Sequence, residues 1–298
     1  MEYTHETKWV AAADVRPGQH CVLYPRVPMG PGAPISTAEA ELRGWYQAEG
    51  WSERGSVHLG LHESKDPIDY IVGLAKETYP GALVSVYPDP ARHAATIRIG
   101  VGPEIASTYR EQYGPNSVEM RVPPMVWQFN HAQTCAFLKG YIRGDGCITR
   151  KPGSKYTVVS MTSASNRLMF EIQHLLTRIG VFASYTVTGP REDRFSKRSM
   201  FRLTIEGRQI EQMLFLDPTL QWSDRQAFFC DEKHFYLPCT SVERQEYTGQ
   251  VYNAETADNT YLGAFVVHNS EQREWYKVLF RLYHPEEEPE DLRGEHIP

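Results

Sequence analysis

The feature that most constrains this chain is a nine-residue motif that occurs twice, ninety-six positions apart. The first copy reads L-R-G-W-Y-Q-A-E-G over residues 42–50, and the second reads L-K-G-Y-I-R-G-D-G over residues 138–146. Each copy carries two small residues four positions apart: Gly44 and Ala48 in the first, Gly140 and Gly144 in the second. In a helix this spacing puts the small residues on one face, so we expect two helices that pack backbone to backbone.

Each copy ends in an acidic residue followed by glycine, Glu49-Gly50 and Asp145-Gly146. We expect each glycine to end its helix in the left-handed conformation, which fixes the direction of the acid before it. Packing through the small faces would then bring Glu49 and Asp145 together at the end of the helix pair. Two converging carboxylates are typical of a Mg²⁺ site, because hard divalent cations prefer oxygen ligands.

With its glycines and both acids, the repeated motif resembles the paired LAGLIDADG motifs of homing endonucleases. The resemblance implies an α+β fold and a monomeric nuclease that makes a Mg²⁺-dependent double-strand cut in DNA. It also implies that Glu49 and Asp145 are the metal-binding and catalytic residues. The alternative is a pair of ordinary core helices whose acids face solvent.

Length and composition are those of a soluble globular protein, with 298 residues, of which 41% are hydrophobic and 23% charged. No stretch approaches the roughly 18 apolar residues of a transmembrane helix, and the first ten residues lack a signal-peptide core. We therefore expect a cytoplasmic protein with no membrane partner, in a phage, bacterial or archaeal host. The five cysteines have no C-x-x-C spacing, which argues against both disulfides and zinc.

The net charge of −6 is unevenly distributed along the chain. Residues 138–208 contain 13 Lys and Arg against 5 Asp and Glu, a local balance of +8, whereas residues 35–121 contain 8 against 12. A basic second repeat is the expected phosphate-facing surface. The DNA-binding candidates, on or between its strands, are Arg150, Lys151, Lys155, Arg191, Arg194, Lys197, Arg198 and Arg202. The alternative for any one of them is a solvated basic face.

The segments that follow the two motifs share one pattern, which predicts a duplicated αββαββα domain. Repeat one is placed at 35–121 and repeat two at 130–216, within an endonuclease domain at 35–238. Further helices are expected at 66–79, 103–113, 166–179 and 208–215. Strands are expected at 56–61, 82–87, 95–101, 147–150, 156–162, 182–187 and 200–205. Each repeat would present a curved antiparallel sheet, and the two sheets would form a saddle over a DNA duplex.

Two flanking stretches are mostly β in pattern. Residues 9–28 read W-V-A-A-A-D-V-R-P-G-Q-H-C-V-L-Y-P-R-V-P, with an expected strand at 21–24. Residues 249–270 read G-Q-V-Y-N-A-E-T-A-D-N-T-Y-L-G-A-F-V-V-H-N-S, with strands expected at 251–252 and 264–267 around a turn. The first resembles the region before the endonuclease insertion of inteins, and the second resembles their C-terminal splice junction. The resemblance implies a partial Hint splicing domain (1–28 and 239–269), followed at 270–298 by the host extein.

The residue types at this junction suit autocatalytic protein splicing. The side-chain amide of Asn269 can attack its own main-chain carbonyl and break the bond to Ser270. His268 can donate a proton to the leaving amine, and the Ser270 hydroxyl can accept the upstream acyl group. The alternative is a chance V-V-H-N-S sequence on an edge strand.

The chain departs from the intein pattern in ways that shape the expectation. An intact intein begins with Cys or Ser and carries a T-x-x-H motif, and neither is found here. We therefore expect the C-terminal part of a split intein, with an N-terminal intein fragment and the host extein as partners. A truncated gene and a start codon called inside a longer frame are the alternatives. Asn259 stands where inteins often place a histidine, which would slow splicing.

The nuclease pattern has its own departure. Met120, followed by Arg121, stands where a lysine commonly precedes the second motif, and Lys233 is a candidate catalytic counterpart for the second half. Arginine supplies charge there but cannot exchange a proton at neutral pH. Three functions stay open: a splicing element with an embedded endonuclease, an endonuclease without splicing activity, and a DNA-binding remnant, which Met120 favours.

Overall fold

The computed structural model describes residues 10, 14–19, 21–150, 153–190, 198–226, 228–243, 260–262 and 266–268. The chain divides into two compact units. Unit 1 comprises Met1–Arg26 and Ala227–Pro298, and unit 2 comprises Val27–Gln226. In the described part of the chain, the helices are too short or too polar to cross a membrane.

Unit 2 contains two repeats that follow one another along the chain. The first repeat is α1 (Thr37–Glu49), β2 (Gly50–Glu53), β3 (Ser56–His62), α2 (Ile68–Thr78), β4 (Val84–Asp89), β5 (Ala94–Gly100) and α3 (Pro103–Tyr113). The second repeat is α4 (His131–Asp145), β6 (Gly146–Arg150), β7 (Thr157–Ser163), α5 (Asn166–Arg178), β8 (Ser184–Thr188), β9 (Met200–Ile205) and the 3₁₀ helix η4 (Gly207–Met213). Two further 3₁₀ turns are η2 (Pro90–Arg92) and η3 (Pro124–Gln128).

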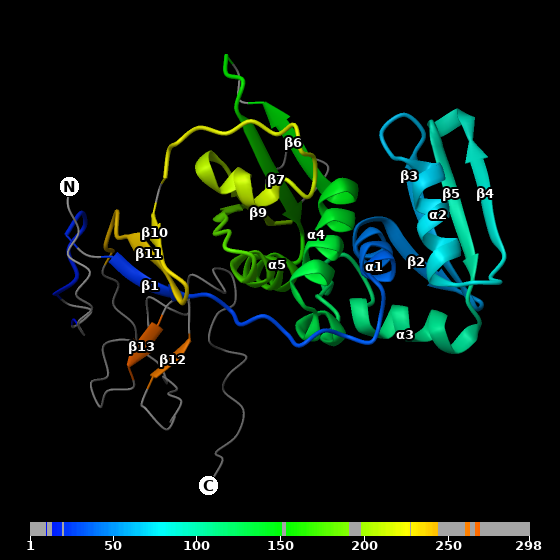
Figure 1. Ribbon diagram of the computed structural model, residues 1–298, viewed down its shortest axis with the longest axis horizontal. Helices are drawn as coiled ribbons and strands as arrows, with labels where there is room; N and C mark the ends of the chain where they lie inside the picture. The colour runs from blue at the N-terminus through cyan, green and yellow to red at the C-terminus, as the bar shows by residue number, and fades with distance from the viewer. Residues whose placement is uncertain are drawn as a thin grey trace, which may run out of the picture. The chain divides into compact units, whose positions relative to one another are not determined.

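The two repeats have the same sheet topology. Each sheet is antiparallel and four-stranded, in the order β2-β3-β5-β4 in the first repeat and β6-β7-β9-β8 in the second. Figure 1 shows α1 and α4 side by side between the two sheets. The predicted duplication of an α+β unit is therefore present, except that its last helix is a 3₁₀ helix in the second repeat.

The small residues predicted to join the two helices lie in the contact between α1 and α4. A Cβ atom on Gly44 would collide with the carbonyl oxygen of Phe137, and one on Gly140 would collide with that of Glu41. A Cβ atom on Gly144 would lie 2.5 Å from the Cβ of Ala48. No larger side chain fits at these points, so the two helices pack backbone to backbone, as the spacing of the small residues predicts.

The two glycines after the acids adopt a conformation that the sequence did not predict. Gly50 has φ −100° and ψ 151°, and Gly146 has φ −83° and ψ 165°, so both are extended rather than left-handed. Glycine is needed there because of close contact. An added Cβ would collide with the Tyr46 ring at Gly50 and with the carbonyl oxygen of Ile142 at Gly146. Each helix thus passes directly into the first strand of its sheet.

Hydrogen bonds at the start of α4 fix the segment that leads into α1. Asn130 and Gln133 form a capping box at the N-terminus of α4. The Gln133 side chain also donates to the carbonyl oxygens of Ala33 and Ile35, at 2.8 Å each, and accepts from the main-chain N–H of Ala33. Gln133 is buried, so this amide joins the two helix starts away from water.

Each sheet has one covered face and one open face. Alternate strand residues pack into the two hydrophobic cores, with the helices of the same repeat. These covered residues include Val57, Leu59, Ile97 and Ile99 in the first sheet and Val159, Met161, Leu203 and Ile205 in the second. The intervening residues form the opposite face, on which Ser56, His58 and Ser160 are buried while Arg98 and Arg202 are exposed.

Unit 1 contains a three-stranded sheet and a hairpin in its described residues. The sheet has the order β1-β11-β10, formed by β1 (Cys21–Pro25), β10 (Phe229–Cys230) and β11 (His234–Pro238). The hairpin pairs β12 (Thr260–Leu262) with β13 (Val266–His268). The predicted endonuclease range of 35–238 differs from this division, because β11 pairs with β1 and β10 pairs with β11 in unit 1. The strand expected at 251–252 lies outside the described residues.

Several elements differ from the prediction for local reasons. The sequence analysis missed β2, whose Gly-Trp-Ser-Glu sequence has low strand propensity. It placed a turn where β12 forms, although Thr-Tyr-Leu favours a strand.

Cys135, Cys147, Cys230 and Cys239 are free thiols.

Candidate functional site

Glu49 and Asp145 lie at the matched ends of the two packed helices. Glu49 is the last residue of α1, and Asp145 is the last residue of α4. The Cγ atom of Glu49 lies 3.3 Å from the Cβ position of Gly144, the residue directly before Asp145. The close contact between the helices thus brings the two predicted acids to the same end of the helix pair, because the small residues carry no bulky side chain to hold the helices apart.

The environment of the pair disfavours negative charge. Burial, and after it the negative charges of Asp145 and Asp66, together raise the pKa of Glu49 to about 7. Burial raises the pKa of Asp145 to about 6, although this residue stays open to solvent on one side. Burial disfavours the charged form of both carboxyl groups, and the charge of Asp145 further disfavours that of Glu49. Such a pair fits a divalent cation, which would relieve both the desolvation and the repulsion.

Asp66 brings a third carboxylate toward the first half of the site. It precedes α2, and its Oδ2 atom accepts a hydrogen bond from the main-chain N–H of His62 at 2.6 Å. Within the described ranges, no three His, Cys, Asp or Glu side chains are grouped closely enough to hold a metal ion. The fit to Mg²⁺ therefore rests on Glu49 and Asp145, and Mg²⁺ commonly takes one or two carboxylates and completes its shell with water and phosphate oxygens.

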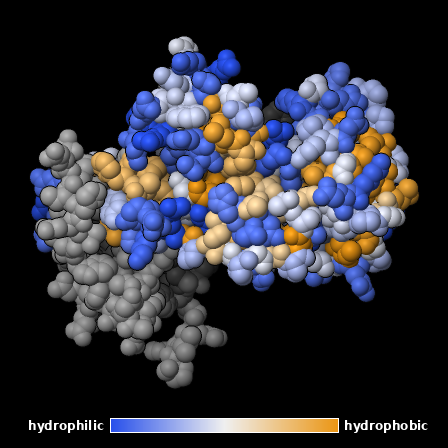
Figure 2. Space-filling model, in the orientation of Figure 1, coloured by the Kyte–Doolittle hydropathy of each residue, from blue (hydrophilic) through white to orange (hydrophobic). Residues whose placement is uncertain are grey.

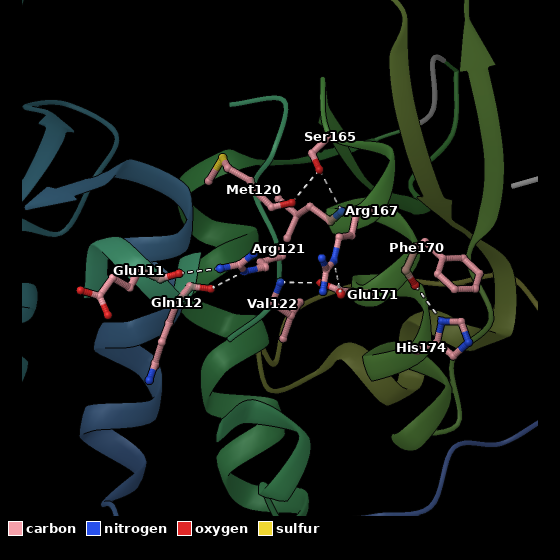
Figure 3. A network of polar contacts seen from close by, with 11 residues as sticks. Glu111, Gln112, Met120, Arg121, Val122, Ser165, Arg167, Phe170, Glu171 and His174 are labelled. Carbon is pink, nitrogen blue, oxygen red and sulfur yellow. Dashed lines mark hydrogen bonds and ion pairs between the residues drawn. The ribbon is translucent and has the colours of Figure 1, made fainter. Parts of the chain in front are cut away.

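Arg121, which precedes the second motif, and Lys139 on α4 make contacts elsewhere. Arg121 donates to the main-chain carbonyls of Glu111 and Gln112, at 2.6 and 3.1 Å, and so caps the C-terminus of α3 (Figure 3). Lys139 binds the Glu41 carboxylate at 2.9 Å. The expectation that Arg121 supplies charge to the metal site is therefore replaced by a structural role at the end of α3.

The segment around Met120 is fixed to the second repeat, as Figure 3 also shows. The main-chain N–H of Val122 donates to the Glu171 carboxylate at 2.6 Å, and the Ser165 hydroxyl donates to the Met120 carbonyl at 2.6 Å. Arg167 pairs with Glu171 at 2.8 Å on the same helix, α5. The linker between the repeats thus binds to α3 through Arg121 and to α5 through its main chain.

Only some of the predicted DNA-binding residues lie in the described part of the chain. Arg150, Lys155 and Arg198 are exposed, and Arg202 projects from the open face of the second sheet. The Arg202 guanidinium donates to the Ser160 hydroxyl at 3.0 Å. Figure 2 shows a hydrophilic surface at the tip of β6 and β7. Four predicted residues lie outside the described residues: Lys151, Arg191, Arg194 and Lys197.

The open face of the first sheet carries polar and aromatic residues that the sequence analysis did not select. Trp51, His58 and Arg98 are directly paired across β2, β3 and β5. Arg98 donates to the Ser56 hydroxyl at 3.0 Å, in the same diagonal geometry as Arg202 and Ser160. The alternation of residues along β3 and β5 signalled two faces, but only the strand register puts these three side chains in one row.

The remaining predicted site residues lie in unit 1. Lys233 is exposed in the turn between β10 and β11, where its main-chain N–H donates to Asp231 at 2.7 Å. Its catalytic role beside the acids therefore stays a prediction. His268 is the last residue of β13, and Asn269 and Ser270 lie outside the described residues.

Comparisons with known proteins agree with the second of the two motifs. Residues 132–214 match the model of the LAGLIDADG-like domain family. The chain is 26% identical to the ATP-dependent DNA helicase Hel308 of Thermococcus kodakarensis, over 83% of this chain and 23% of the helicase. It is also 26% identical to an iron-sulfur cluster assembly SufBD family protein of Mycobacterium tuberculosis, over 89% of this chain and 31% of that protein. The chain thus spans less than a third of the length of these curated relatives.

A further relative and two solved structures complete the comparison. The replicative DNA helicase DnaB of Rhodothermus marinus is 23% identical over 67% of this chain and 22% of its own length. The N-terminal LAGLIDADG domain of DUF199/WhiA has a TM-score of 0.39, 13% identity and coverage of 62% of this chain and 84% of its own. The homing endonuclease I-WcaI, bound to its DNA recognition sequence, has a TM-score of 0.40, 12% identity and coverage of 63% and 84%. The family match itself is confined to residues 132–214, which contain the second motif and its sheet and are recognised as a LAGLIDADG-like domain.

Proposed function

We propose that unit 2 is a site-specific DNA endonuclease that makes a Mg²⁺-dependent double-strand cut. The observation that carries this proposal is the meeting of Glu49 and Asp145 at the ends of two glycine-packed helices, between two sheets with open faces. The LAGLIDADG-like match supports it, because it covers the helix that carries Asp145. The protein acts as a monomer in this proposal, since one chain supplies both acids and both sheets.

The chain's own residues have distinct tasks in this reaction. Glu49 and Asp145 hold the cations between them, and the packed glycines keep the two carboxylates at a fixed separation. Strand side chains such as Arg202 contact base edges, while exposed loop cations such as Lys155 contact phosphates. Bound Mg²⁺ supplies charge stabilisation for the attacking water and for the leaving oxygen of each phosphodiester.

Binding and cutting are tested separately. Duplexes that bind the protein are first selected from a randomised library in EDTA, and the selected pool is then incubated with Mg²⁺. The wild type should cut both strands, while Glu49→Gln and Asp145→Asn should bind the same pool and leave it intact. If the wild type selects no DNA, or if either variant cuts as well as the wild type, the proposal is wrong.

A DNA-binding protein without nuclease activity is the second candidate. The bonds that occupy Arg121 and Lys139 favour it, because neither cation is free to polarise a water at the acid pair. In the same assay this candidate predicts a selected pool that stays uncut in Mg²⁺. It also predicts that Glu49→Gln leaves DNA affinity unchanged at every metal concentration.

Protein splicing by the flanking segments is a further proposal. It is supported by the curated relatives, which are named as two DNA helicases and an iron-sulfur cluster assembly protein. This chain matches less than a third of the length of each relative. A match over 89% of the chain exceeds unit 2, so the shared segment includes flanking residues. An element that is inserted into different host proteins is expected to be shared in this way. In the proposed splicing reaction, Asn269 cyclises, His268 donates the proton and Ser270 is the nucleophile.

The splicing proposal has its own test. The protein is incubated with a cognate N-terminal intein fragment, and mass spectrometry follows the release of residues 270–298 and the formation of ligated product. Release should disappear in Asn269→Ala, whereas DNA cutting should be unaffected. If release does not depend on Asn269, the splicing proposal fails and the nuclease proposal is untouched.

A further inference from the structure

The two open sheet faces present different chemistry at matched positions. Strand pairing defines one row across each sheet, at the same distance from its acid. The row in the first sheet is Trp51, His58, Arg98 and Ser85. The matching row in the second sheet is Cys147, Ser160, Thr204 and Ser184. A large aromatic ring thus stands where the second sheet has a small thiol, although the backbone topology of the two repeats is the same.

The Trp51 side chain packs against its neighbours in the first sheet. Its ring stacks on the His58 ring, with centroids 5.1 Å apart and planes 13° from parallel. Its edge covers Gly60, where the Cβ position lies only 3.3 Å from the Cζ3 atom of Trp51. His58 is buried beneath it, whereas Trp51 remains 43% exposed. The flat indole ring of Trp51 therefore leaves part of its surface exposed as an apolar plate.

Charge and further exposed groups border this plate. Arg98 is exposed next to His58 in the same row and is held by its hydrogen bond to Ser56. On the next row, Tyr87 is 51% exposed on the edge strand β4. A guanidinium beside an apolar plate is complementary to the edge of a DNA groove, where phosphates flank the apolar methyl groups of thymine.

The second sheet has hydrogen-bonding groups in the corresponding area. Arg202 is paired with Thr162 on one side and Thr186 on the other. Its Nη2 atom donates to Ser160, and Thr204 lies in the next row. Hydroxyls and a guanidinium distinguish bases by their donors and acceptors, and arginine does so most strongly at guanine.

We propose that the two sheets read their half-sites by different means, with Trp51 contacting the C5-methyl groups of thymine in one half. This inference rests on the proposed DNA binding by unit 2. Thymine alone among the four bases carries a methyl group in the major groove. The exposed part of the indole ring offers van der Waals contact to an apolar group, and a methyl group is the apolar feature of a base edge that it can distinguish.

Replacement of thymine by deoxyuridine tests this contact, because it removes only the methyl group. Duplexes from the binding-selected pool are prepared with deoxyuridine in one half-site or in the other, and affinities are measured by fluorescence anisotropy in EDTA. Burial of a methyl group predicts a loss of about four-fold per contacted thymine. Wild-type protein should show this loss in one half-site, and Trp51→Ala should bind the thymine and deoxyuridine forms of that half-site equally.

Matched variants separate the contact from folding. Cys147→Ala changes the equivalent position of the second sheet and should keep the full deoxyuridine effect. Trp51→Phe keeps an apolar ring and should retain part of it. Gly60→Ala should weaken it, because the new methyl group would lie 3.3 Å from Cζ3 of Trp51 and the ring would have to shift by a few tenths of an ångström. Arg202→Gln should lose affinity for guanine in the half-site that shows no deoxyuridine effect. This loss assigns that half-site to the second sheet and the other half-site to the first.

The outcomes distinguish this inference from the function on which it rests. If the wild type binds DNA but shows no deoxyuridine effect in either half-site, the thymine contact is wrong and DNA binding stands. The same conclusion follows if Trp51→Ala keeps the effect of the wild type. If the wild type selects no duplex at all, the proposed function itself is wrong.

Discussion

At the residue scale, the raised pKa values of the two acids have a consequence for stability. A carboxyl group whose folded pKa exceeds its unfolded value destabilises the fold once it is ionised. For Glu49 the cost is absent below about pH 4.5 and complete above about pH 7. Without metal, Glu49→Gln should therefore melt about 2–4 °C higher than the wild type at pH 8, a change of roughly 1 kcal/mol for a partly solvated group.

The same experiment contains its control. At pH 5 the Glu49 side chain is already protonated in the folded protein, so the difference between the variant and the wild type should become small. Excess Mg²⁺ at pH 8 should raise the melting temperature of the wild type and leave that of Glu49→Gln nearly unchanged. A variant that melts below the wild type at pH 8 without metal would contradict the electrostatic description of the pair.

Arg121 gives a second prediction at this scale. Because its guanidinium binds two carbonyls at the end of α3, Arg121→Gln should lower the free energy of unfolding by about 1–2 kcal/mol. Metal-dependent cutting by the folded variant should equal that of the wild type. Urea unfolding and single-turnover cleavage measure the two effects. A loss of cutting without a loss of stability would restore Arg121 to the metal site.

At the element scale, the contact between α1 and α4 depends on missing side chains. A Cβ atom on Gly140 would collide with the Glu41 carbonyl, so Gly140→Ala should cost about 3 kcal/mol or more. Gly73, in the middle of α2, is the matched control, because a Cβ atom there meets nothing within 4 Å. Gly73→Ala should stabilise the protein by about 0.5–1 kcal/mol. Equal effects of the two substitutions in urea unfolding would contradict the packing.

This contact also explains how far the sequence predicts the fold. The small residues and acids repeat in one sequence, so the helix pair and the duplicated order of elements could be predicted from spacing alone. The conformation of Gly50 could not, because the reason for glycine there is the neighbouring Tyr46 ring rather than a left-handed turn. The Trp51–His58–Arg98 row was also missed, since it depends on which strands pair and in which register.

At the scale of the whole molecule, charge is concentrated where contact with phosphates is proposed. The chain is acidic overall, but its second repeat is basic, and Arg150 and Lys155 are exposed there. Replacing both with glutamine should make the fall of log affinity with log salt concentration shallower, by about 1 in slope for each residue. Lys76→Gln, on α2 of the first repeat, should leave the slope unchanged. Identical slopes for all three proteins would remove these two residues from the DNA contact.

The measurement that tests the acid pair most directly is a Mn²⁺ titration of the DNA-bound protein, followed by electron paramagnetic resonance at pH 8. Mn²⁺ reports on a Mg²⁺ site because both cations prefer oxygen ligands. The account predicts bound Mn²⁺ in the wild type, weaker binding in Glu49→Gln and in Asp145→Asn, and none at this site in the double variant. Equal Mn²⁺ binding by the wild type and the double variant would contradict it.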